Sequence, residues 1–105
     1  MQTQTQTHTP SPWEVSTYEN GDVAVYGEND PSGRDLALVR GSSEAEANAR
    51  LIAAAPDLLA ALEAALPLII HAWRKSADAR DTQAEERYSE TGKAMQAAIS
   101  KATNA

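Results

Sequence analysis

The sequence predicts an α+β fold, in which a three-stranded antiparallel meander precedes a short helix and a C-terminal helical hairpin. Short runs rich in β-branched and aromatic residues occupy positions 13–40, and turn-forming residues separate them. Positions 44–103 instead repeat apolar residues at helical spacing. One long kinked helix in place of the hairpin is the alternative, because no Gly or Pro occurs between Trp73 and Gly92. We expect a disordered tail at 1–11 and a single α+β domain at 12–105, with the meander at 12–41 and the helices at 43–103.

The apolar content of this short chain is dominated by alanine. Of its 105 residues, 21 are Ala and only 16 are Leu, Ile or Val. Such a composition supplies a thin core, so we expect a homo-oligomer in which each copy buries part of its surface against another. The absence of Cys excludes disulfides and thiolate metal sites.

The first forty residues predict three strands. Asn20-Gly21 lies between two strand-like runs, and this dipeptide is typical of a hairpin with a type I′ turn. A second turn region covers 28–35, and residues 36–40 form the third short strand.

Capping and proline signals place the helices. Ser43 and Glu46 fit a capping box that begins a helix at 44–55, whose inner face would carry Ala45, Ala49, Ile52 and Ala53. Pro56 must end or bend that helix and suits the first turn of the next one, which Pro67 is expected to kink. A second capping box, Thr82 to Glu85, begins the last helix. Its predicted seam is Ala84, Tyr88, Thr91, Met95, Ala98 and Ala102.

The charge and hydropathy of the chain predict a soluble cytoplasmic protein. The apolar run at 66–73 is interrupted by Pro67 and His71 and is shorter than the roughly 20 residues of a membrane span, so no membrane partner is expected. The first ten residues show no signal peptide. The net charge of −6 disfavours direct binding to nucleic-acid backbones.

The best candidate ligand site lies between the third strand and the first helix. Arg40, Ser42 and Ser43 flank Gly41 at a helix N-terminus, where free amides, a guanidinium and hydroxyls suit a phosphate. The alternative is an ordinary linker and cap, because Glu44 and Glu46 in the first turn would repel an anion.

Asn48 and Arg50 are further candidate ligand residues. An Asn amide reads the edge of a base or ribose, and an Arg clamps a phosphate or stacks on a base. The structural alternative pairs Arg50 with Glu46 across one helical turn and leaves Asn48 facing water.

Aromatic residues on the predicted hairpin suggest an oligomer interface. Trp73, beside two basic residues, resembles an interface anchor, and Tyr88 and Met95 lie on the seam of the last helix. Asp78, Asp81 and Glu85 also stand at helical spacing, but neighbouring arginines make a solvated face the better interpretation, so no metal is expected. His71 and His8 lack partners of a nucleophilic site. We therefore expect no catalytic residues, no cofactor and no enzyme.

Three stretches of the chain resemble a family of small phage and prophage proteins. The family pattern is an HTPxPW start, matched by residues 8–13, and a NARLIAAAPDLLAALE centre, matched by residues 48–63; residues 97–103 match its end. The resemblance implies an accessory phage protein in the host bacterial cytoplasm and carries no agreed activity. The layout of a small sheet followed by helices also resembles phage proteins that sequester nucleotide-type immune signals.

Two functions follow from these observations. The first is a non-enzymatic anti-defence protein that sequesters a cyclic nucleotide or an ADP-ribose-type signal at a subunit interface, through Arg40, Ser42, Ser43, Asn48 and Arg50. The alternative is an acidic interaction module that inhibits a nucleic-acid-binding host defence protein by presenting carboxylates in place of phosphates. Its acidic run would be Asp78, Asp81, Glu85, Glu86 and Glu90. Arg40 and Arg50 converging in a cleft would favour the first, and both on open surface the second.

Overall fold

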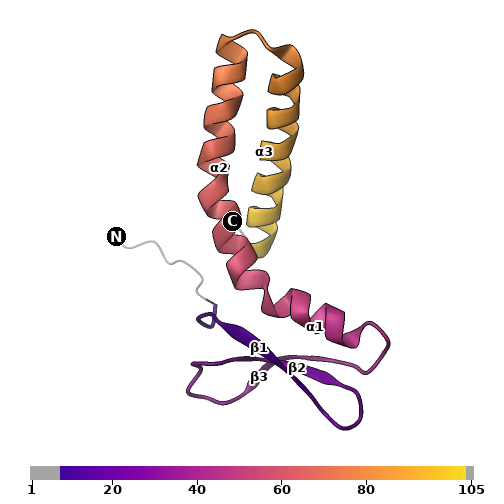
Figure 1. The fold of residues 1–105 in the computed structure, drawn as a ribbon. Coiled ribbons are helices and arrows are strands. Elements are labelled where there is room, and N and C mark those ends of the chain that lie inside the picture. Colours follow the sequence, from indigo (N-terminus) through magenta and orange to yellow (C-terminus); the bar gives the residue numbers. More distant parts are fainter. Residues whose placement is uncertain (1–7, 104–105) are drawn as a thin grey trace. The chain divides into compact units, whose positions relative to one another are not determined.

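The computed structural model describes residues 8–103 and has the predicted α+β layout (Figure 1). Three antiparallel strands come first and three helices follow, the last two forming a hairpin. In chain order the elements are β1 (Trp13–Thr17), β2 (Val23–Gly27), β3 (Asp35–Val39), α1 (Ala45–Ala53), α2 (Ala55–Asp78) and α3 (Thr82–Thr103).

The chain divides into two compact units, residues 1–58 and residues 59–105. We name them the sheet unit and the hairpin unit. The single domain expected over 12–105 stays a prediction. Of the tail expected at 1–11, residues 1–7 lie outside the described part of the chain.

The sheet is an antiparallel meander in the order β1-β2-β3. Thr17 pairs with Val23 across the first turn. The type I′ turn expected there is wrong, because only Gly21 has a positive φ, of +91°. Gly21 N–H donates to the Tyr18 carbonyl at 3.0 Å and Tyr18 N–H donates to the Asp22 carbonyl at 2.8 Å. These bonds enclose a three-residue loop, in which the glycine adopts the conformation that a side chain disfavours.

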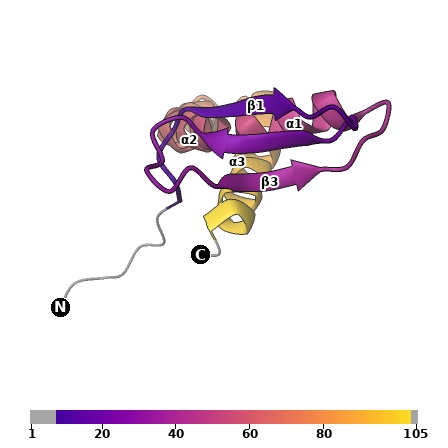
Figure 2. The same cartoon turned by 90° about the horizontal axis from the view of Figure 1, so that it is seen from below.

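The core of the sheet unit forms where α1 packs on one face of the sheet (Figure 2). Val23 and Val25 of β2 meet Ala45 and Ala49 of α1, and all four are at most 2% exposed. Alanine at the contact lets the helix approach closely, so two valines suffice to fill the space. The predicted inner face of α1 is confirmed, since Ile52 and Ala53 also pack against this cluster.

The capping box expected at the start of α1 does not form. The helix begins at Ala45 with Glu44 as its N-cap, and no side chain caps it. Glu46 instead pairs with Arg50 at 2.7 Å, and the Ser43 hydroxyl donates to Glu44 at 3.2 Å. Both members of the predicted box therefore have other partners.

Pro56 has the predicted role at the junction of two helices. α1 ends at Ala53, and α2 begins at Ala55 with Pro56 in its first turn, where the missing N–H costs no hydrogen bond. Pro67 lies inside α2, which continues past it to Asp78.

In the turn between α2 and α3, the C-terminal cap of α2 is followed directly by the N-cap of α3. Arg80 adopts a left-handed conformation with φ of 58°. Its N–H donates to the Ala77 carbonyl, and Asp81 N–H donates to the Ser76 carbonyl at 3.0 Å. This is the Schellman pattern, normally provided by glycine. Asp81 then caps α3 by accepting from Ala84 N–H at 3.1 Å. The capping box expected to start at Thr82 is thus wrong by one residue.

The predicted seam of α3 is correct at three of its six positions, and the other three each precede a half-buried residue by one position. Ala84, Tyr88 and Met95 are half-buried as expected, whereas Thr91, Ala98 and Ala102 are exposed. The half-buried positions after Tyr88 include Gly92, Met95, Ile99 and Thr103. The spacing follows the side of α3 that faces α2, where Gly92 approaches Ile69.

By length and composition alone, α2 qualifies as a membrane-spanning helix, with a mean hydropathy of 1.4 over its most apolar window and 6% of that window buried. The expectation that the protein has no membrane partner stays a prediction.

We expect Asp81→Ala to destabilise the hairpin by about 1 kcal/mol, because it leaves the Ala84 amide without its acceptor. Thermal unfolding followed by circular dichroism measures the loss as a lowered Tm. Glu90→Ala, an exposed change in the middle of α3, is the control. Equal melting temperatures for the two variants would contradict the cap.

Candidate functional site

The HTPxPW segment folds against the sheet unit. The Trp13 indole N–H donates to the Thr9 carbonyl at 2.9 Å, and the His8 ring meets the Trp13 ring edge-on with centroids 5.9 Å apart. A Cβ added at buried Gly27 would lie 2.7 Å from Thr9 Cγ2. His8 and Thr9, which the sequence assigned to a disordered tail, therefore lie against Trp13 of β1 and Gly27 of β2, and this part of the motif has a structural explanation.

The Gly41 segment is held tightly against the first turn of the sheet. The Asp22 carboxylate accepts a hydrogen bond from Gly41 N–H at 2.7 Å, and the Asn20 side chain holds Asp22 in turn. A Cβ at Gly41 would lie 3.1 Å from the Gly21 carbonyl carbon. The Asp22 carboxylate therefore already accepts the hydrogen bond of the Gly41 amide, which the sequence had suggested as a donor to a phosphate.

The other residues of this candidate ligand site are spread over the surface. Arg40, Ser42 and Ser43 are exposed, as is Asn48 on α1. Arg50 is also largely exposed, its side chain 68% accessible, and it forms the predicted ion pair with Glu46. The structural alternative for Asn48 and Arg50 is therefore the arrangement that the molecule adopts.

A shallow pocket of about 280 Å³ lies beside Arg50 in the sheet unit. Trp13, Val15, Ala53 and Ala54 supply its apolar wall, and Glu14 and Asp57 also line it. Arg40 does not line this pocket, so the structure does not bring the two arginines into one cleft. A guanidinium that is already paired with Glu46, with Asp57 nearby, gives a poor environment for a phosphate.

The face of the sheet that α1 leaves uncovered carries a tyrosine that sequence reasoning did not assign. The Tyr18 hydroxyl donates to Asp35 Oδ2 at 2.8 Å. Tyr18 follows β1 and Asp35 begins β3, so the ring must cross the intervening β2, where Ala24 is 1% exposed. The hydrogen bond to Asp35, together with the negative charge of that carboxylate, raises the pKa of Tyr18. The sequence signal for this crossing was Ala24, the small residue between Val23 and Val25 of β2.

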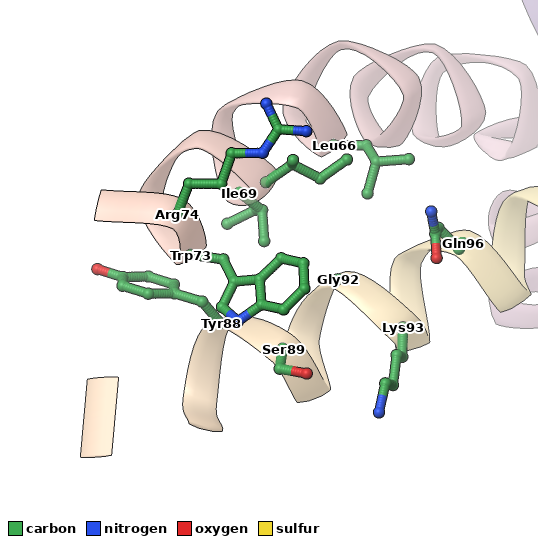
Figure 3. A pocket seen from close by; sticks show the side chains of 10 residues that line it. Leu66, Ile69, Trp73, Arg74, Tyr88, Ser89, Gly92, Lys93 and Gln96 are labelled. Atoms are coloured by element: carbon green, nitrogen blue, oxygen red, sulfur yellow. The ribbon is translucent and has the colours of Figure 1, made fainter. Parts of the chain in front are cut away.

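An apolar groove of about 320 Å³ runs between α2 and α3 (Figure 3). The Trp73 and Tyr88 side chains point into the space between the helices, whereas Lys93 points away from it. The lining residues are Leu66, Ile69, Ile70, Trp73 and Arg74 of α2, with Tyr88, Ser89, Gly92, Lys93 and Gln96 of α3. Two of the three predicted interface residues therefore share one groove, and Met95 lies half-buried on α3 outside its lining.

The charges of the protein are segregated between its two units. The sheet unit holds nine acidic residues and three arginines, whereas the hairpin unit holds six acidic and six basic residues. The whole formal net charge of −6 therefore belongs to residues 1–58. The acidic run predicted at 78–90 is offset by Arg74, Lys75, Arg80, Arg87 and Lys93.

Within residues 8–103, no group of three or more His, Asp or Glu side chains is placed to hold a metal ion.

These features define a small α+β protein with an acidic sheet unit and an apolar groove in its helical hairpin. The chain belongs to the family of Salmonella phage P22 protein Y8K6, whose model matches residues 1–105. The resemblance to a small phage protein family is thereby confirmed, while the likeness to signal-sequestering phage proteins stays a prediction. No curated protein and no solved structure matched the chain.

We expect Gly41→Ala to lower the free energy of unfolding by roughly 1–3 kcal/mol, because the added methyl group would press on the backbone of Gly21. Urea unfolding monitored by tryptophan fluorescence measures the change. Ser42→Ala, at the exposed neighbouring residue, is the matched control and should leave stability unchanged. A Gly41→Ala protein as stable as this control would show that the two segments are not closely packed.

Proposed function

We propose that this phage protein is a non-enzymatic anti-defence factor of the host cytoplasm that binds a host defence protein through the acidic surface of its sheet unit. The partner's basic surface would otherwise hold nucleic acid. The observation that carries the proposal is the location of the entire net charge on residues 1–58. A concentrated negative surface attracts a nucleic-acid-binding site and steers its approach.

The uncovered face of the sheet offers carboxylates in a defined order. Glu14 of β1 and Asp35 of β3 both pair with Tyr26 of β2, which places the two acids on either side of the tyrosine. Glu28 follows directly after the end of β2. Exposed carboxylates around a half-buried aromatic ring suit the arginine and lysine side chains of a phosphate-binding surface.

The proposal predicts that Glu14→Lys combined with Glu28→Lys weakens capture of the host partner by roughly tenfold or more, through lost charge complementarity. Tagged full-length protein would capture partners from host lysate, and titration with the identified partner would give the affinity. Duplex DNA should compete with capture.

The matched control is Glu86→Lys combined with Glu90→Lys, which changes the net charge equally but on the hairpin unit. Equal losses from both pairs, or capture that DNA does not compete with, would overturn the proposal. If only the Glu86→Lys and Glu90→Lys pair weakened capture, the binding surface would instead be the acidic run at 78–90 that the sequence predicted.

Sequestration of a nucleotide-type signal is the second candidate. It is favoured by the position of Arg50 in a pocket beside the Trp13 indole, a pair that stacks on or clamps nucleotides elsewhere. Against it, Glu46 engages the Arg50 guanidinium, Asp22 engages the Gly41 amide, and Arg40 lies on open surface. The geometry therefore supports the acidic surface better.

Calorimetry separates the two candidates. Protein freed of carried-over ligand and titrated with a panel of cyclic nucleotides and ADP-ribose isomers should release no binding heat if the acidic surface is the functional one. Heat that disappears in Arg50→Ala and persists in Arg34→Ala, a change at an exposed arginine in the β2–β3 turn, would establish sequestration instead.

A further inference from the structure

The hairpin unit buries almost none of its own side chains. Within residues 59–103 the single buried residue is Ser76, whose hydroxyl donates to the Ala72 carbonyl one turn earlier at 3.0 Å. Leu68 is 70% exposed and Trp73 is 40% exposed. Most helical stability in proteins comes from packing an apolar face, and within residues 59–103 this hairpin fully buries no apolar side chain.

The groove between α2 and α3 has the composition of an interface centre. Its floor and walls are apolar, through Leu66, Ile69 and Trp73, and Arg74 and Lys93 form a polar rim. An apolar centre surrounded by polar residues is the usual arrangement of a buried contact between proteins.

We propose that this groove is occupied by the same groove of a second copy of the chain, the two hairpins packing antiparallel as a four-helix bundle. The hairpin unit carries six acidic and six basic residues, so two copies meet without net repulsion. The acidic sheet unit is joined to the N-terminal end of each hairpin unit. Antiparallel packing places the two points of attachment at opposite ends of the bundle.

The charges along α2 favour antiparallel packing of the two hairpins. A Cβ at Gly92 would touch Ile69 at 3.6 Å, which sets these two residues at the same height in the hairpin. Arg74 lies five residues after Ile69 and Glu63 lies six residues before it. A two-fold axis at that height brings Arg74 of one copy level with Glu63 of the other, whereas parallel packing would set each charge level with its own copy.

The charges along α3 give the same result. Lys93 lies one residue after Gly92 and Glu90 lies two residues before it. The two-fold axis therefore also brings opposite charges together on the second pair of helices. On both helices, antiparallel packing therefore sets a basic residue of one copy near the level of an acidic residue of the other.

The area available is sufficient for a stable dimer. α2 has 24 residues and α3 has 22, so their paired length is about 33 Å at about 1.5 Å per residue. With helices about 10 Å apart, one face of the hairpin covers roughly 650 Å². Two such faces together exceed the roughly 1,000 Å² that a specific interface requires.

Sedimentation equilibrium of the full chain at micromolar concentration tests the pairing. The wild-type protein should have twice the 11.2 kDa mass of one chain. Ile70→Lys, which places a charge in the groove, should raise the dimer dissociation constant at least tenfold. Leu68→Lys is the matched control, because Leu68 is exposed and does not line the groove. Circular dichroism establishes that both variants keep their helices.

Single cysteines determine the direction, since the natural chain has none. Lys93→Cys, near the proposed axis, should form a disulfide between copies under mild oxidation. Glu63→Cys alone should not, whereas the double variant with Glu63→Cys and Arg74→Cys should. Cross-linking by Glu63→Cys alone would indicate parallel packing and overturn the arrangement.

Three further outcomes would refute the proposal. They are a monomeric wild-type protein, equal weakening by Ile70→Lys and Leu68→Lys, and a monomer that sediments with phosphatidylglycerol vesicles. The last would assign the apolar face of α2 to a membrane. None of these outcomes bears on capture through the sheet unit, whose acidic residues are separate from the groove.

Discussion

A shortage of large apolar side chains is the constraint on which this structure depends. With 16 Leu, Ile and Val residues in 105, the chain cannot fill two cores. The sheet unit meets the shortage with small residues, because Ala45 and Ala49 let α1 lie close to Val23 and Val25. The hairpin unit concentrates its larger residues on α2, where none of them is fully buried by the chain itself. One unit is therefore packed internally, and the other presents an apolar groove.

Polar contacts hold the sheet unit where apolar packing is thin. Asp22 connects the first turn to Gly41, and the Tyr18–Asp35 hydrogen bond crosses the central strand on the uncovered face. The Thr9 carbonyl accepts a hydrogen bond from the Trp13 indole N–H. Of these bonds, only the last lies in a stretch that resembles the phage family, residues 8–13. That stretch therefore has a structural role in the sheet unit.

Charge and hydropathy separate the two proposed activities. The acidic residues that face a host partner belong to residues 1–58, whereas the groove proposed to pair two copies belongs to the neutral hairpin unit. Pairing through the hairpin would present two acidic surfaces per dimer. A bivalent arrangement of this kind strengthens capture of a multivalent partner without any new contact.

The sequence by itself determined the order of strands and helices, the inner face of α1 and the helix junction at Pro56. Each of these depends on local chemistry, namely side-chain period and the missing proline N–H. The tertiary structure alone decided the rest. Arg80 enters a left-handed conformation that favours glycine, and this conformation turns one possible long helix into a hairpin. Likewise, Asp22 reaches across 19 residues to the Gly41 amide, so a loop that had looked ready for phosphate is already satisfied by a carboxylate. Partners so distant in sequence leave no local pattern, because only folding brings them within hydrogen-bond distance.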